Sequence, residues 1–304
     1  MKKRFLALLF SILCAHSGAG AQPREQFPYV TIPYTIASEG ARAEWFALHF
    51  WDSYDFSAAE TKYSPEANKQ GFVNYIGVLY ATSPEYSAKA IGEMMQRAAK
   101  SEDGYWYFLE MAEMALYDPT SPMRNDLLWE MFLHHAVGEK SPLDESSKER
   151  YRSMLKLVSR NQQGQKATDF VYTRADGSQG RLYDIKAPFV VIYFYNPGCS
   201  ECARTKAQID ASGYLDALHE MGAVEVLALH PDEDLTEWRR RLPENPKWWI
   251  SAYDKGQKIN RNELYDLKAI PTLYLLDDQK RVMMKDPTVE DFIGVLGSLL
   301  GIEN

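Results

Sequence analysis

The chain has 304 residues, of which 45% are hydrophobic and 25% are charged. This balance excludes disorder as the main state, and the length predicts about two domains. The formal net charge of −8 argues against nucleic acid as a partner, because nucleic-acid binding rewards clustered positive charge.

The first 21 residues have the pattern of a secretory signal peptide. A basic start at residues 2–4 is followed by an apolar run at residues 5–14 and by small residues that end at Ala21. The apolar run is shorter than the ~20 residues of a membrane span, so we expect cleavage after Ala21 and export to the periplasm. The rest of the sequence shows no further span, and we expect a soluble mature protein.

The cysteines are few, and their placement is informative. Of the three, Cys14 lies in the signal peptide, which raises the alternative of a lipoprotein. Lipid attachment requires a small residue just before the cysteine, however, and this chain has Leu13 there. The mature chain would keep only Cys199 and Cys202, and a disulfide between them closes too small a loop to stabilise the fold much.

Residues 22–163 are predicted to form an all-α domain. An extended segment containing prolines leads to a first helix near Ser38 or Glu39, and helical periodicity continues to about Arg160. We expect about six helices, in a bundle or in stacked hairpins, because a series of apolar stripes recurs at helical spacing. The stripes are Phe72, Tyr75, Ile76 and Leu79; Tyr105, Phe108, Leu109, Ala112 and Leu116; Leu128, Met131, Phe132 and His135; and Tyr151, Met154, Leu155 and Val158.

Two Ser-Pro pairs in this region, Ser83-Pro84 and Ser121-Pro122, predict helix starts. Each offers a capping hydroxyl followed by proline at the first helical position. A tetratricopeptide array is an alternative for the same region, but no repeat of ~34 residues supports it.

Residues 161–166 are polar and lack periodicity, which predicts a linker. Beyond it, strands at 169–173 and 180–185 flank Asp176-Gly177, a hairpin turn signal. Strands alternating with helices then predict an α/β domain with parallel strand pairs over residues 166–304. The remaining expected elements are strands at 189–195, 223–229 and 248–253, a helix from Pro231 through Trp238, a closing hairpin at 272–277 and 280–284, and a last helix carrying Phe292, Val295, Leu296 and Leu299.

The sequence around the two cysteines indicates redox chemistry. A short apolar strand ends at Asn196-Pro197-Gly198, and Cys199 and Cys202 follow on the opening turn of a predicted helix. Helix N-terminal N–H groups and the macrodipole favour a thiolate, so the first cysteine is expected to be a good nucleophile.

Two other interpretations of the cysteine pair are weaker. A structural zinc site takes four ligands, and neither a second cysteine pair nor a suitably spaced histidine pair is present, so no metal is expected. A peroxidase would need a threonine three residues before its cysteine, where Asn196 stands.

With these residues in place, residues 166–304 resemble a thioredoxin-fold domain of the TlpA/ResA type, a family of exported thiol–disulfide oxidoreductases. The match rests on the hairpin before the central strand, on the Cys-x-x-Cys motif, and on the segment 269–277 with its Ile270-Pro271. The resemblance implies that Pro271 is a cis-proline facing the cysteines and that the backbone of Ile270 pairs with an incoming peptide. It places Pro197 and Gly198 in the same substrate groove.

The sequence departs from thioredoxin at two positions. Gly198 precedes the first cysteine where thioredoxin has tryptophan, and Tyr193 stands where thioredoxin has a buried acid that assists proton transfer. The proton acceptor for Cys202 is therefore open. Glu201 is the nearest carboxylate in sequence, although we interpret it as a solvated residue at the helix start.

Residues 42–56 are similar to an uncharacterised helical domain that precedes thioredoxin-like domains in exported Gram-negative proteins. His49, Trp51 and Asp52 could form a functional constellation there, but an aromatic core and a capped helix end explain them more simply. His134-His135 is likewise interpreted as one histidine at the core edge and one in solvent rather than as a ligand pair.

These observations predict a periplasmic thiol–disulfide oxidoreductase in which Cys199 attacks a substrate disulfide and Cys202 resolves the mixed disulfide. Family resemblance and the acidic Glu201 favour a reductase. Its expected partners are protein or small-molecule disulfides and a membrane electron donor, and no cofactor is expected. The alternatives are a partner-binding protein whose thioredoxin fold is a scaffold for the helical domain, and a disulfide isomerase.

Overall fold

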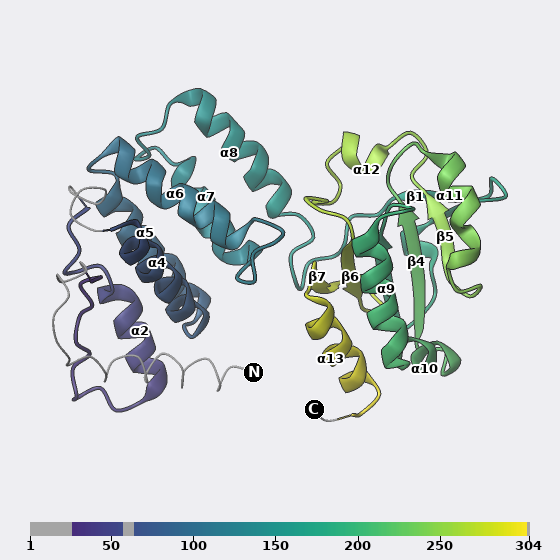
Figure 1. Ribbon diagram of the computed structural model, residues 1–304, viewed down its shortest axis with the longest axis horizontal. Coiled ribbons are helices and arrows are strands. Elements are labelled where there is room, and N and C mark those ends of the chain that lie inside the picture. Colours follow the sequence, from purple (N-terminus) through teal and green to yellow (C-terminus); the bar gives the residue numbers. More distant parts are fainter. Residues whose placement is uncertain (1–25, 57–63, 303–304) are drawn as a thin grey trace. The chain divides into compact units, whose positions relative to one another are not determined.

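The protein is described here by a computed structural model that covers residues 26–56 and 64–302 (Figure 1). The predicted signal peptide lies outside these residues. The chain divides into two compact units between Leu155 and Lys156, and each is described by itself. The domain limits 22–163 and 166–304 stay a prediction.

The N-terminal unit is helical, as predicted, and its helices begin at capping side chains. Ser38, Ser64, Ser83 and Ser101 each accept a backbone N–H of the first turn through the hydroxyl oxygen. Within the described part of the chain the helices are α2 (Glu39–His49), α4 (Pro65–Tyr80), α5 (Pro84–Ala98), α6 (Glu102–Leu116), α7 (Asp126–Ala136) and α8 (Glu145–Val158).

One of the two predicted Ser-Pro helix starts is correct and the other is wrong. Ser83 caps α5 with Pro84 in the first turn. Ser121 caps no helix, because its hydroxyl donates to the carbonyl of Ala115 at 2.6 Å. The next helix, α7, begins at Asp126 and is capped by the side chain of Asn125.

The core of the N-terminal unit is built from rings around Trp51, whose side chain is buried as predicted. The ring centroids of Phe27, Tyr54, Tyr75 and Phe108 lie between 5.1 and 5.3 Å from that of Trp51. Tilted and edge-on pairs of this kind add to the apolar burial.

The C-terminal unit is a mixed sheet covered by helices, as the thioredoxin-like prediction requires. The strand order is β2-β1-β5-β4-β3-β6-β7, with parallel pairing of β3 to β4 and of β4 to β5. The strands are β1 (Val171–Arg174), β2 (Gln179–Arg181), β3 (Phe189–Phe194), β4 (Val224–His230), β5 (Ile250–Tyr253), β6 (Thr272–Leu276) and β7 (Val282–Lys285). The helices are α9 (Ser200–Ser212), α10 (Tyr214–Glu220), α11 (Leu235–Arg241), α12 (Lys258–Arg261) and α13 (Val289–Leu299).

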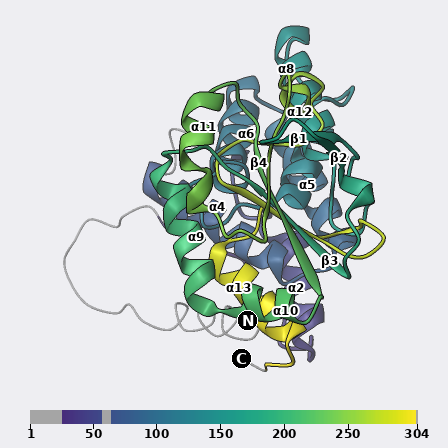
Figure 2. The same cartoon turned by 90° about the vertical axis from the view of Figure 1, so that its right-hand side faces the viewer.

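Alternation along β3 sends its side chains into two separate cores. Val191 and Tyr193 enter the core shared with α9, α10, α11 and α13, whereas Val190, Ile192 and Phe194 enter the core on the other face of the sheet. Helices α9 and α13 lie side by side (Figures 1 and 2). Tyr193 is therefore directed toward the helix that carries the cysteines.

The helix predicted to begin at Pro231 begins later, at Leu235. The carboxylate of Asp234 accepts the N–H of Glu237 and caps α11. The carboxylate of Asp232, an alternative cap, instead accepts a hydrogen bond from Asn196.

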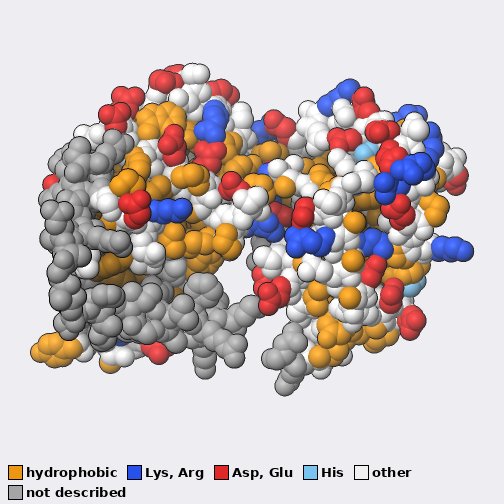
Figure 3. All heavy atoms as spheres, in the orientation of Figure 1, with side chains coloured by type: hydrophobic (Ala, Val, Ile, Leu, Met, Phe, Trp, Pro, Cys, Tyr) orange, Lys and Arg blue, Asp and Glu red, His pale blue; other side chains and the backbone are white. Residues whose placement is uncertain are grey.

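Acidic and basic side chains lie intermingled on the face of the C-terminal unit that Figure 3 shows. Among the described residues no helix is both long and apolar enough to span a bilayer.

Candidate active site

Cys199 follows the short turn after β3 and is the N-cap of α9. Its backbone is extended, with φ −71° and ψ 118°, and its Sγ accepts the N–H of Cys202 at 3.1 Å. Gly198 before it has φ +80°, a conformation that favours glycine. The tight turn thus places a sulfur where a capping oxygen usually lies, and an N–H donor there stabilises a thiolate.

The two cysteines differ in exposure. Cys199 is half-buried, whereas Cys202 is only 3% exposed. Burial, followed by the hydrogen bond to Cys199, raises the pKa of Cys202 to about 12. Both sulfurs are free thiols. The accessible Cys199 is thus suited to attack a substrate, and the buried Cys202 is suited to a later, internal step.

One residue of the segment 269–277, Ile270, lies against Cys199. The thiol of Cys199 lies 3.8 Å from the carbonyl oxygen of Ile270, to which it donates. The peptide bond between Ile270 and Pro271 is cis. Pro197 and Gly198 line a hollow of about 300 Å³ on the cysteine turn, together with residues of α9 and Asn245.

Tyr193 occupies the position of the buried acid in thioredoxin, but it does not act as an acid or a base there. Its hydroxyl donates to the carbonyl of Cys202 at 2.7 Å, and its ring stacks on that of Tyr195 with centroids 5.4 Å apart. Burial raises the pKa of Tyr193 far above its ordinary value of 10.0. The residue is therefore a neutral donor that ties β3 to the first turn of α9.

Glu201 lies inside the motif but points into solvent. Its side chain is 58% exposed and forms an ion pair with Arg204. This agrees with its interpretation as a solvated residue at the helix start.

Two polar residues beside the cysteine turn, His230 and Asp232, were not predicted as site residues from the sequence, and both interact with Asn196. The side chain of Asn196 donates to Asp232 at 2.6 Å, and Nδ1 of His230 lies 3.0 Å from Oδ1 of Asn196. A sequence signal existed, because His230 ends and Asp232 follows a buried strand parallel to β3, and the carboxyl ends of such strands meet at one edge of a sheet.

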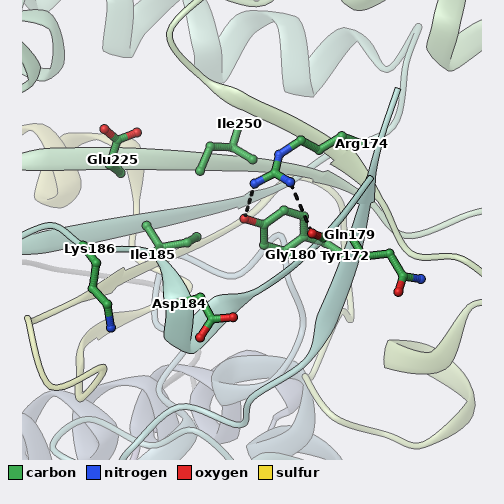
Figure 4. Close-up of a pocket in the computed structure, with 9 residues that line it drawn as sticks. All are labelled: Tyr172, Arg174, Gln179, Gly180, Asp184, Ile185, Lys186, Glu225 and Ile250. Carbon is green, nitrogen blue, oxygen red and sulfur yellow. Dashed lines mark hydrogen bonds between the residues drawn. The ribbon is translucent and has the colours of Figure 1, made fainter. Parts of the chain in front are cut away.

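A second hollow, of about 440 Å³, lies near the opposite ends of the parallel strands (Figure 4). On its wall, Lys186 precedes β3, Glu225 lies in the first half of β4 and Ile250 begins β5, whereas Cys199 follows the end of β3. In Figure 4 the guanidinium of Arg174 lies above the hydroxyl of Tyr172, to which it donates at 3.2 Å. No cysteine lines this hollow, and we do not assign it to the redox site.

In the N-terminal unit the structure brings His49 and Asp52 together and separates Trp51 from them. Nδ1 of His49 lies 2.7 Å from Asp52, which also accepts from Arg97 at 2.7 Å, and all three side chains are partly exposed. Trp51 is buried in the core.

His134 and His135 occupy different environments, as predicted. His134 is exposed. His135 is half-buried, and burial lowers its pKa.

Comparisons with known proteins agree with both halves of this description. The family described as Domain of unknown function (DUF5106) matches residues 11–161. The crystal structure of a thioredoxin-like protein from Bacteroides caccae superimposes with a TM-score of 0.85 and 35% identity, covering 89% of this chain and 97% of that one.

Curated relatives match through part of the chain. Thiol-disulfide oxidoreductase ResA of Bacillus cereus is 26% identical over 149 residues, covering 48% of this chain and 83% of the relative. The protein of the same name from Bacillus anthracis is 27% identical over 144 residues, covering 47% and 77%. This chain belongs to the thioredoxin-like thiol–disulfide oxidoreductases and carries a helical DUF5106 domain at its N-terminal side.

Proposed function

We propose that this protein is an exported thiol–disulfide reductase that acts through Cys199 and Cys202. The observation that carries the proposal is the unequal placement of the two sulfurs. The Sγ of Cys199 is half-buried at the N-cap of α9 and accepts an N–H at 3.1 Å, whereas Cys202 is 3% exposed. A nucleophile needs access and a stabilised thiolate, and a resolving thiol needs only to reach its neighbour.

The reaction has two steps. The thiolate of Cys199 attacks one sulfur of a substrate disulfide, and the other substrate sulfur leaves as a thiolate that takes up a proton. The thiol of Cys202 then loses its proton and attacks Sγ of Cys199, which releases the second substrate thiol and forms the Cys199–Cys202 disulfide. Two electrons and two protons pass from the protein to the substrate.

Ile270, Pro271, Pro197 and Gly198 would form the substrate groove around Cys199. The contact between the Cys199 thiol and the carbonyl of Ile270 supports this assignment, because a sulfur bound to Cys199 would lie beside that backbone. The Ile270 backbone would then pair with an extended peptide substrate.

The proposed direction is reduction. A pair becomes oxidising when its reduced form is strongly stabilised by positive charge and by hydrogen-bond donors. Among the described residues, Sγ of Cys199 makes hydrogen-bond contacts with one N–H and one carbonyl, and Glu201 adds a carboxylate two residues away in the sequence. This modest stabilisation of the thiolate favours a reducing pair, recharged by a membrane electron donor after export to the periplasm.

An equilibrium titration of the full chain against glutathione tests the direction. We expect a potential well below the ~ −120 mV of strong oxidants. A value near that limit would reverse the direction. A wild-type protein that reduces no disulfide, with a Cys199–Cys202 bond resistant to mild reductant, would instead support a binding role. Efficient repair of scrambled disulfides would identify an isomerase.

A further inference from the structure

A chain of three polar side chains holds the turn that leads into Cys199. Asn196 donates through Nδ2 to the carboxylate of Asp232 at 2.6 Å. Nδ1 of His230 lies 3.0 Å from Oδ1 of Asn196 and 3.4 Å from the carbonyl oxygen of Tyr195. His230 is only 1% exposed and is the last residue of β4, while Asp232 is half-buried two residues later.

The direction of each hydrogen bond among these three side chains follows from which of their atoms can donate. A carboxylate only accepts, so the amide NH₂ of Asn196 faces Asp232 and its oxygen faces His230. Both oxygens near Nδ1 of His230 also only accept, so Nδ1 carries the hydrogen. Burial lowers the pKa of His230, which keeps the ring neutral and leaves Nε2 as a lone pair. All donors then point one way, from His230 through Asn196 to Asp232.

Asn196, held in place by His230 and Asp232, interacts through its backbone with both cysteines. Its carbonyl accepts the N–H of Cys199 at 3.3 Å. Burial is the main cause of the raised pKa of Cys202, and a backbone hydrogen bond from Asn196 opposes it. Two residues lie between Asn196 and Cys199. Pro197 has no N–H that could form a hydrogen bond, and Gly198, as a glycine, has the most flexible backbone of any residue type. The side chain of Asn196 therefore anchors the start of the turn.

We propose that His230 and Asp232 are positioning residues that, through Asn196, hold Cys199 at the N-cap of α9 and so set the reactivity and the redox equilibrium of the cysteine pair. This inference rests on the proposed function. A loosened turn weakens the contact between Sγ of Cys199 and the N–H of Cys202. The thiolate of the reduced form then loses stabilisation, and the equilibrium shifts toward the disulfide, which makes the protein more reducing.

The test uses the full chain with four substitutions. His230→Phe removes the donor and keeps a ring, and His230→Gln offers an amide donor to the same oxygens. Asp232→Ala removes the acceptor from a half-buried site and can report even where a substitution at the buried His230 prevents folding. His219→Gln is the matched control, because His219 is half-buried at the other end of β4, with Nδ1 3.4 Å from the Val224 carbonyl.

Two measurements distinguish positioning from packing. One is the pH profile of Cys199 alkylation by iodoacetamide, which needs no exchange activity, and the other is the equilibrium constant with glutathione. In His230→Phe and Asp232→Ala we expect alkylation at neutral pH to slow about three- to tenfold, which is the value of one hydrogen bond. The equilibrium constant should shift toward the disulfide by a similar factor, at 29.6 mV per tenfold.

If the three side chains act as one hydrogen-bonded network, the effects of the variants should also be coupled. His230→Gln should recover most of the wild-type profile, His219→Gln should match the wild type, and the His230→Phe/Asp232→Ala double variant should add little to either single one. Wild-type alkylation and equilibrium in both single variants would overturn the inference. So would a change in His230→Phe alone that follows lost thermal stability and is not recovered by glutamine. A wild-type protein without exchange activity overturns the proposed function, whereas active variants with unaltered profiles overturn only the positioning role.

Discussion

The hydroxyl of Tyr193 donates a hydrogen bond to the backbone carbonyl of Cys202 at 2.7 Å. The bond joins the central strand to the first turn of the cysteine helix, in the place where thioredoxin has a titrating acid. Because burial holds the pKa of Tyr193 far above 10.0, the hydroxyl stays protonated throughout the physiological range. Its role is to fix the helix rather than to move a proton.

Tyr193→Phe should therefore separate stability from chemistry. Removing one hydrogen bond should lower the free energy of unfolding by about 1 kcal/mol. The rate of disulfide exchange in a single turnover should stay within about twofold, since this hydroxyl bonds the Cys202 carbonyl and does not hold the turn that positions Cys199. Urea denaturation and stopped-flow kinetics measure the two effects. A tenfold slower resolving step at unchanged stability would show that the hydroxyl takes part in proton transfer.

Cys202→Ser should trap a substrate on Cys199. The first step needs only the exposed sulfur, and without the thiol of Cys202 the mixed disulfide cannot be resolved from within. Mass spectrometry under non-reducing conditions should find one substrate thiol bound per chain. Cys199→Ser is the control and should bind none. Equal trapping by both variants would contradict the assignment of Cys199 as the nucleophile.

The resolving step should depend steeply on pH. Burial, which does not depend on a free Cys199 thiol, is the main cause of the raised pKa of Cys202, so its attacking thiolate is scarce at neutral pH. Below the pKa the thiolate fraction rises with pH, and the rate of resolution should rise about tenfold per unit between pH 7 and 9. Rapid acid quenching of the mixed disulfide gives the rate. Glu201→Gln should leave the profile unchanged, because that carboxylate points into solvent and pairs with Arg204. A flat profile would reveal a base that serves Cys202.

The features that the sequence predicted correctly depend on local chemistry. The strand before Cys199 is marked by a β-branched and aromatic run, the hairpin at Asp176-Gly177 by its turn residues, and the start of α5 by Ser83 and Pro84. In each case the residues that decide the structure are adjacent along the chain. Ser121 shows the limit of this approach, since its hydroxyl has a competing acceptor at Ala115 that only the packed turn supplies.

The features that escaped prediction depend on long-range contacts. Tyr193 was recognised as a departure from thioredoxin, but its partner across the core, the Cys202 carbonyl, is set by how α9 packs on β3. His230 and Asn196 lie 34 positions apart and meet only because β3 and β4 run in parallel. The parallel pairing predicts that both residues lie at one edge of the sheet, but it does not specify which side chains meet there.

Gly71→Ala should destabilise the helical unit by about 1–3 kcal/mol, the cost of overpacking a tight core. Gly71 is buried in α4, and a Cβ there would lie nearer to the ring of Phe27 than the 3.0 Å that Cβ atoms keep. Phe27 cannot yield easily, because it is 6% exposed and packs against Trp51 and other rings.

Thermal or urea unfolding of the full chain measures this cost, and two further variants identify its cause. Gly40→Ala in α2 is the matched control, since nothing lies within 4 Å of its added Cβ, and it should change stability by less than about 0.5 kcal/mol. In a Phe27→Ala background the ring is gone, so adding Gly71→Ala should cost nothing further and gain some helix propensity. If Gly71→Ala costs as much without the ring as with it, the contact with Phe27 is not what requires glycine at this position.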